Sequence, residues 1–74
     1  MPDRTDYEAF AANLLKAELK RRGVTYAQLV DKLAEIGVFE KEVNVRNKLS
    51  RGKFTAAFLL QCLRAIGAET LRLD

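Results

Sequence analysis

The sequence predicts a compact all-α domain of four helices, on the strength of its composition, its glycine spacing and its capping signals. Its 74 residues are 49% hydrophobic and 31% charged, an apolar share too high for a disordered segment and enough for one small core. The four glycines are spaced 14, 15 and 15 residues apart, as residues that end helices of about 10–15 residues would be. They are Gly23, Gly37, Gly52 and Gly67. We expect one domain over residues 1–74, with a polar arm at 1–5 and a tail at 68–74.

The first helix is expected from Asp6 to Arg22. Thr5 and Glu8 fit the capping box, in which a Ser or Thr side chain and a Glu or Gln three residues later satisfy each other's backbone N–H groups. At 100° per residue, one side of this helix is apolar and is expected to face the core. Its members are Tyr7, Phe10, Ala11, Leu14 and Leu15.

The second helix is expected from Tyr26 to Ile36, with Thr25 and Gln28 as a second capping box. Its apolar residues again share one side. They are Leu29, Val30, Leu33, Ala34 and Ile36.

The third helix lies between Gly37 and Gly52 and begins either at Glu40 or after Asn44 as its N-cap. Only Val45 and Leu49 form an inward pair. The outward arc is polar and basic, with Asn44, Asn47, Lys48 and Arg51 at its centre and Arg46 at its flank. Residues 43–53 carry four basic side chains and no acid, while the whole chain has a net charge of only +3.

The fourth helix is expected from Ala56 to Ile66, after a Thr55 cap flanked by Phe54 and Leu59 as a hydrophobic staple. Its apolar arc spans roughly 200°, more than a monomer of this size needs, and Leu71 and Leu73 follow in an alternating tail. We therefore expect a homodimer through the end of this helix and the tail. We also expect four side chains to be largely buried: Leu33, Val45, Leu59 and Leu63.

Several functions are disfavoured by what the chain lacks. It has no His, and Cys62, its single cysteine, lies on an apolar helix side, so no nucleophile–base pair, zinc site or disulfide is apparent. None of the ten carboxylates lies in a segment that looks buried, and no phosphate-binding loop motif is present. Without a long apolar run or a signal-peptide pattern, we expect a reduced cytoplasmic protein that is not an enzyme and needs no metal or cofactor.

The third helix instead has the chemistry of a DNA-reading element. Asn can make paired hydrogen bonds to adenine, Arg or Lys can do so to guanine, and further cations gain from phosphate attraction. The simpler interpretation is a solvated basic face, which such runs usually are.

The order of elements resembles the lambda-repressor-like (XRE-type) helix-turn-helix domain over about residues 12–67. The matching features are the helix end at Lys20-Arg21-Arg22-Gly23, the Val24-Thr25 start of a short helix, and the closing segment Leu49-Ser50-Arg51-Gly52-Lys53. Residues 54–67 resemble the helix that follows in that family. The stretch from residue 47 to residue 54 is also similar to one in a group of short bacterial proteins, a resemblance that implies no function.

The resemblance implies a DNA-binding transcriptional regulator that reads the major groove with the helix ending at Gly52. Base-facing residues would be Asn44, Asn47 and Lys48. Phosphate contacts would come from Thr25, Gln28, Arg46, Arg51 and Lys53. The chain departs from the family in having Tyr26 where Gln usually opens the second helix, Ser50 where Glu is common, and a turn longer by about three residues before the third helix.

Two other functions remain open. The wide apolar arc of the fourth helix suits a protein-interaction module, such as an antitoxin-like or adaptor domain on the same scaffold. RNA binding is the other, although the aromatic residues mostly occupy expected core or staple positions, which disfavours single-strand stacking. They are Tyr7, Phe10, Phe39, Phe54 and Phe58.

Overall fold

A computed structural model describes residues 4–73, apart from the side chain of Thr5, and within that range it is all-helical with no strand. The helices are α1 (Arg4–Arg22), α2 (Tyr26–Glu35), α3 (Glu42–Arg51) and α4 (Ala56–Ala65). The predicted all-α class and the four helices are confirmed. None of these helices is long and apolar enough to cross a membrane.

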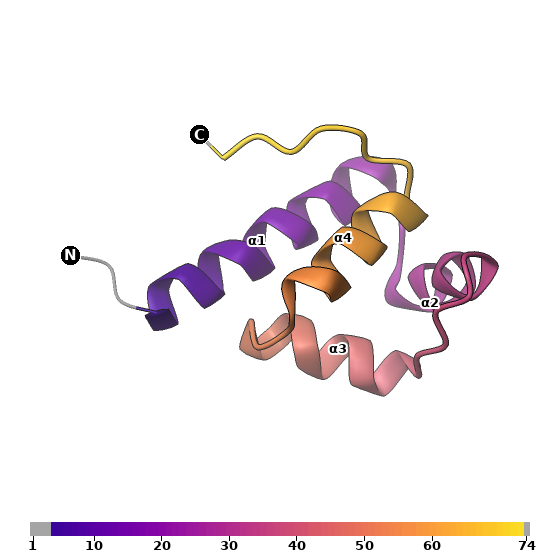
Figure 1. Cartoon of the computed structure of the whole chain (residues 1–74), viewed down its shortest axis with the longest axis horizontal. Coiled ribbons are helices and arrows are strands. Elements are labelled where there is room, and N and C mark those ends of the chain that lie inside the picture. The colour runs from indigo at the N-terminus through magenta and orange to yellow at the C-terminus, as the bar shows by residue number, and fades with distance from the viewer. Residues whose placement is uncertain (1–3, 74) are drawn as a thin grey trace.

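The helices form a bundle in which two helices each pack against the other two. α1 packs against α3 and α4, and α2 packs against the same pair. In Figure 1, α4 crosses in front of α1, α3 runs along the lower edge, and α2 lies at the right. α3 is therefore held from behind by α1 and α2, which leaves its other side to solvent.

The two threonine caps fix where α2 and α4 begin, as predicted. Thr25 accepts a hydrogen bond from the backbone N–H of Gln28, whose side chain accepts one from the Thr25 backbone N–H in return. Thr55 accepts from the backbone N–H of Phe58. Both helices end one residue earlier than expected, because Ile36 and Ile66 serve as their C-caps.

A glycine with positive φ lies at or just after the end of each helix, which confirms the prediction that the four glycines mark the helix ends. Gly52 adds a close approach between elements. It caps α3 in the left-handed conformation with φ 69°, and a Cβ built on it would lie 2.4 Å from the backbone carbonyl oxygen of Glu8. The end of α3 can therefore lie directly on α1 only without a side chain at this position.

One apolar cluster forms the core and draws on all four helices. It comprises Leu15, Leu19, Leu29, Leu33, Val45, Leu49, Phe58, Cys62 and Leu63. The predicted burial of Leu33, Val45 and Leu63 is confirmed, whereas Leu59 is only half-buried at the edge of the cluster.

The predicted face of α1 is wrong in its N-terminal half. Tyr7 is 60% exposed and Phe10 is 40% exposed, while the buried apolar positions are Ala12, Leu15 and Leu19. α1 has 19 residues and the other helices have 10 each, so at 1.5 Å per residue it is about twice as long as its neighbours. Its first turns therefore lack enough partner surface to cover both aromatic rings.

Both predicted starts of the third helix are wrong. α3 begins at Glu42, and Lys41 is its N-cap without a side-chain hydrogen bond, so neither Glu40 nor Asn44 marks the boundary. The carbonyl of Lys41 already accepts from the N–H groups of Asn44 and Val45.

The expected polar arm is shorter than predicted, because α1 already includes Arg4 and Thr5. Thr5 therefore does not occupy an N-cap position. The rest of the arm, residues 1–3, lies outside the described residues.

The expectation that no carboxylate is buried is also wrong. Glu18 is 4% exposed and forms ion pairs with Arg21 at 2.6 Å and Arg22 at 3.3 Å. These partners one turn ahead on α1 satisfy both carboxylate oxygens, which is the condition under which a charged group is tolerated beside a core. This acid therefore has a structural role.

The C-terminal segment runs back along the bundle as extended chain that forms no strand (Figure 1). Leu71 packs on the edge of the core, whereas Leu73 is 66% exposed. Leu60 on α4 is likewise 65% exposed. Leu60 and Leu71 line the same groove between α4 and this segment, so part of that groove is an apolar surface that the monomer leaves open.

Candidate nucleic-acid interface

The solvent face of α3 is polar, and the register of the helix sets which side chains it carries. Val45 and Leu49 are fully buried, so the residues on the opposite side must face water. Of the predicted outward residues, Asn44, Asn47 and Arg51 are exposed. Their amides and guanidinium can therefore reach a partner that approaches α3.

Lys48 does not belong to this exposed row, contrary to the sequence prediction. Its Nζ lies 3.0 Å from Oε2 of Glu40 and 4.3 Å from the ring centroid of Phe58. Position 48 falls on the flank of α3 that turns toward α4, where a long side chain finds both an acid and an aromatic face. A base contact by Lys48 would require this arrangement to open.

Arg46 links α3 to the start of α2. Its Nη2 donates to Oε2 of Glu42 at 2.7 Å, and its guanidinium lies 5.9 Å from the centroid of the Tyr26 ring. Tyr26 is the first residue of α2, so this contact places the N-terminus of α2 beside the middle of α3. The aromatic ring at this position therefore packs against an arginine of α3.

The two polar residues at the start of α2 are exposed but already engaged in the capping box. Oε1 of Gln28 and Oγ1 of Thr25 act there as acceptors. The Gln28 amide N–H groups and the Thr25 hydroxyl hydrogen remain as donors, which is the polarity that a phosphate oxygen requires.

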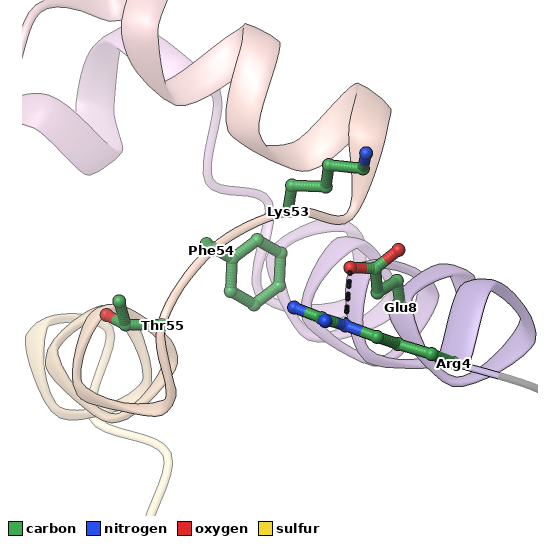
Figure 2. Close-up of a pocket in the computed structure, with 5 residues that line it drawn as sticks. All are labelled: Arg4, Glu8, Lys53, Phe54 and Thr55. Atoms are coloured by element: carbon green, nitrogen blue, oxygen red, sulfur yellow. Dashed lines mark ion pairs between the residues drawn. The ribbon is translucent and has the colours of Figure 1, made fainter.

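At the other end of α3, a cationic depression joins the α3–α4 loop to the start of α1. Arg4, Glu8, Lys53, Phe54 and Thr55 line it, and in Figure 2 the ring of Phe54 points toward Arg4 and Glu8. Nε of Arg4 lies 3.6 Å from Oε2 of Glu8. Sequence reasoning placed Arg4 in a polar arm and missed it, although the spacing of Arg4 and Glu8 by four residues indicates a helical ion pair.

Ion pairs neutralise part of the positive charge around α3 that the sequence window 43–53 predicts. Between residues 40 and 53 there are five basic and two acidic side chains, and both acids pair with cations, Glu40 with Lys48 and Glu42 with Arg46. Within the described part of the chain, the other three cations form no ion pair. They are Lys41, Arg51 and Lys53.

Cys62 is fully buried, as predicted. Burial, and to a smaller extent the Glu40 carboxylate, raises the pKa of its thiol to about 12, against a lowering contribution from Lys48. A thiol with this pKa stays protonated at neutral pH and is a poor nucleophile. Among residues 4–73, no three acidic or cysteine side chains gather closely enough to hold a metal ion.

The exposure of the aromatic residues differs from the prediction that they mostly occupy core or staple positions. Phe54 and Phe58 do pack together, with ring centroids 5.7 Å apart. Tyr7, Phe10 and Phe39 are exposed instead, and Phe39 reaches 82%. These three exposed rings are therefore accessible to a stacked single-stranded base.

Comparison with known proteins gives a family and no function. No curated protein and no solved structure is significantly similar to the chain. Residues 7–71 match the family model described as a domain of unknown function, DUF6471. This match spans nearly all of the four-helix bundle, from the first turns of α1 to the extended C-terminal segment, and the chain therefore belongs to the DUF6471 family.

Proposed function

We propose that the protein is a cytoplasmic helix-turn-helix DNA-binding regulator that reads the major groove with α3 and acts by binding, not by catalysis. The observation that carries the proposal is the solvent face of α3, where Asn44, Asn47 and Arg51 are exposed opposite the buried pair Val45 and Leu49. A short helix that displays amides and cations in this way matches the donors and acceptors on base edges.

The roles of the side chains follow from their surroundings. Asn44 and Asn47 contact bases, preferably adenine, because a carboxamide pairs with its N6 and N7 atoms. Arg51 and Lys53 contact phosphates at one end of α3, and Thr25 and Gln28 do so at the start of α2. Arg46 contributes through the guanidinium N–H groups that its bond to Glu42 leaves free, while Lys48 remains on Phe58 and is withdrawn from the base contacts.

A salt titration of DNA affinity separates the phosphate contacts from the base contacts. With about three to four cations neutralising phosphates, log K should fall with log salt concentration at a slope of roughly −3 per monomer. Lys53→Ala should flatten this slope by nearly one unit and weaken all DNA sequences about equally. Asn47→Ala should keep the slope and relax the preference at one base pair by about 1–3 kcal/mol.

Lys32→Ala is the charge-matched control for this titration. Lys32 lies in the last turn of α2 and lines a surface depression with Gln28, Asp31 and Glu35, so its loss should change the slope less than the loss of Lys53 does. Affinity that does not depend on salt, or identical behaviour of the Lys53 and Asn47 variants, would exclude the proposal. The same titration with single-stranded RNA tests the alternative that Tyr7, Phe10 and Phe39 stack on bases, for which RNA would bind more tightly than duplex DNA.

The proposed regulator works as a homodimer through α4 and the C-terminal segment. Leu60 and Leu73 are exposed and Leu71 is half-buried. Arg64 and Glu69, both exposed, border the groove between α4 and this segment and carry the opposite charges that a two-fold contact can pair. Two copies arranged in this way would present their α3 helices about 34–36 Å apart, one turn of DNA.

Sedimentation of the full chain tests the dimer. The wild-type protein should sediment as a dimer in the micromolar range, and the double substitution Leu60→Ala with Leu73→Ala should shift it to a monomer without unfolding it. A wild-type monomer, both free and on DNA, would contradict the dimer. Retention of duplex DNA binding by that monomer would still leave the reading role of α3 in place. If the wild-type protein binds no DNA but binds another protein through this apolar surface, the alternative function as a protein-interaction module is favoured.

A further inference from the structure

Two exposed apolar side chains lie near the start of α3 in the sequence, one in its first turn and one in the loop that precedes it. Val43 is 53% exposed and Phe39 is 82% exposed, and neither belongs to the core cluster or to the residues packed against it. Both side chains are therefore largely open to solvent and can contact a ligand.

The register of α3 places Val43 within the polar reading face. Val43 precedes Asn47 by four residues, so the two side chains are neighbours on the same side of the helix. This side lies opposite the buried Val45 and Leu49. Val43 is thus an apolar residue among the amides and cations of the outward arc.

Phe39 lies in the loop that enters α3. This loop, residues 36–41, is longer than the turn of the resembled helix-turn-helix family, and Phe39 stands two residues before the N-cap Lys41. The extra length thus carries an exposed ring to the end of the helix that is proposed to enter the groove. Ile36, at the beginning of the loop, is 43% exposed and caps α2.

We propose that Val43 and Phe39 contact the C5-methyl groups of thymines in the major groove, so that α3 recognises thymine as well as adenine. This inference rests on the proposed DNA-binding function and deepens it. The thymine methyl is the one apolar feature on a major-groove base edge, and small apolar or aromatic side chains are its usual partners. Amides for adenine beside apolar groups for thymine favour target sites rich in A·T pairs.

The charges around these side chains favour DNA over a protein as their partner. Between Phe39 and Val43, the acids Glu40 and Glu42 are neutralised by Lys48 and Arg46. Lys41 in the same stretch, and Arg51 two turns further along α3, form no ion pair in the described part of the chain. A polyanion satisfies these cations while the apolar groups reach the base edges. The exposed leucines of α4 and the C-terminal segment lie on other elements, and we assign them to the proposed dimer.

Replacing single thymines by uracil in the preferred duplex tests the inference. The preferred duplex is first selected by the full-length wild-type chain from random double-stranded DNA. Uracil lacks only the C5-methyl group and leaves base pairing and phosphates unchanged. At one thymine position wild-type affinity should fall about fourfold, the effect of uncovering one methyl group. Val43→Ala should bind the thymine duplex about as weakly as the wild type binds the uracil duplex, and the uracil duplex hardly more weakly than that. Phe39→Ala should give the same pattern at a second thymine position.

Matched variants distinguish this contact from other effects. Ile36→Ala should retain the wild-type sensitivity to uracil, and thermal melting should show that the exposed-site variants Val43→Ala and Phe39→Ala remain folded. If the wild-type protein binds thymine and uracil duplexes equally, the methyl contact is overturned while the salt-dependent binding of the proposed function stands. If each variant loses the same affinity on the thymine duplex as on the uracil duplex, its side chain does not contact a thymine methyl group and the inference fails. If no duplex DNA is bound, the inference and the proposed function fall together.

Discussion

Replacing Gly52 with alanine should lower the free energy of unfolding by about 2–4 kcal/mol, through backbone strain and a clash together. The backbone of Gly52 has φ 69°, a conformation that costs an L-residue about 1–2 kcal/mol. The new Cβ would also lie 2.4 Å from the carbonyl oxygen and 2.8 Å from the carbonyl carbon of Glu8. Because these are backbone atoms inside α1, neither can move aside as a flexible side chain would, so the helices must separate.

Gly37→Ala provides the matched control. Gly37 has φ 83° and no heavy atom within 4 Å of a built Cβ, so this variant carries the conformational cost without the clash. In chemical denaturation we expect a loss of about 1–2 kcal/mol for Gly37→Ala and a larger one for Gly52→Ala. For a domain of this size each kcal/mol lowers the melting temperature by about 4–8 °C. Equal losses in the two variants would show that α1 does not press on the end of α3.

The features that the sequence predicted correctly are those that depend on neighbours within one turn of the chain. Thr25 and Gln28 satisfy each other across three residues, so the start of α2 could be predicted without knowledge of the rest of the fold. Gly52 at the end of α3 is a similar local signal, although its contact with α1 is not. The inward pair Val45 and Leu49 followed from helical periodicity alone.

The exposed face of α1 could not be predicted in the same way. The apolar residues Tyr7 and Phe10 continue a helical stripe, and periodicity assigns them to the core. Whether a stripe is buried depends on how far the partner helices extend, and α3 and α4 are too short to cover it. Helix length relative to neighbours is a tertiary property that a periodic pattern does not contain.

The charge of the candidate site was overestimated for a related reason. A window over residues 43–53 contains only basic charges. Glu40 and Glu42 lie just before it and form ion pairs with Lys48 and Arg46. The position of Lys48 also depends on Phe58, a residue of α4. Contacts with the preceding loop and with α4 therefore determine which side chains of α3 remain accessible to a ligand. The sequence of α3 alone does not contain these contacts.

Replacing Leu33 with alanine should have an effect as large as that of the Gly52 substitution, by removing packing from the centre of the bundle. Leu33 is fully buried on α2, the helix that packs against both α3 and α4. Truncation of a buried leucine costs about 2–5 kcal/mol, since the cavity left behind closes only in part. A domain of this length has roughly 4–11 kcal/mol of stability in total, so a large fraction of the variant should be unfolded at physiological temperature.

Leu60→Ala is the control that shows whether the loss at Leu33 comes from its burial. It removes the same atoms from a side chain that is 65% exposed. In dilute solution, where the proposed dimer dissociates, this control should change the free energy of unfolding by no more than about 0.5 kcal/mol. Denaturant titrations of both variants give the comparison directly. Similar midpoints for the two variants would mean that α2 does not contribute the centre of the core. The support of α3 from behind, on which its exposure of Asn44 and Asn47 depends, would then have to come from α1 alone.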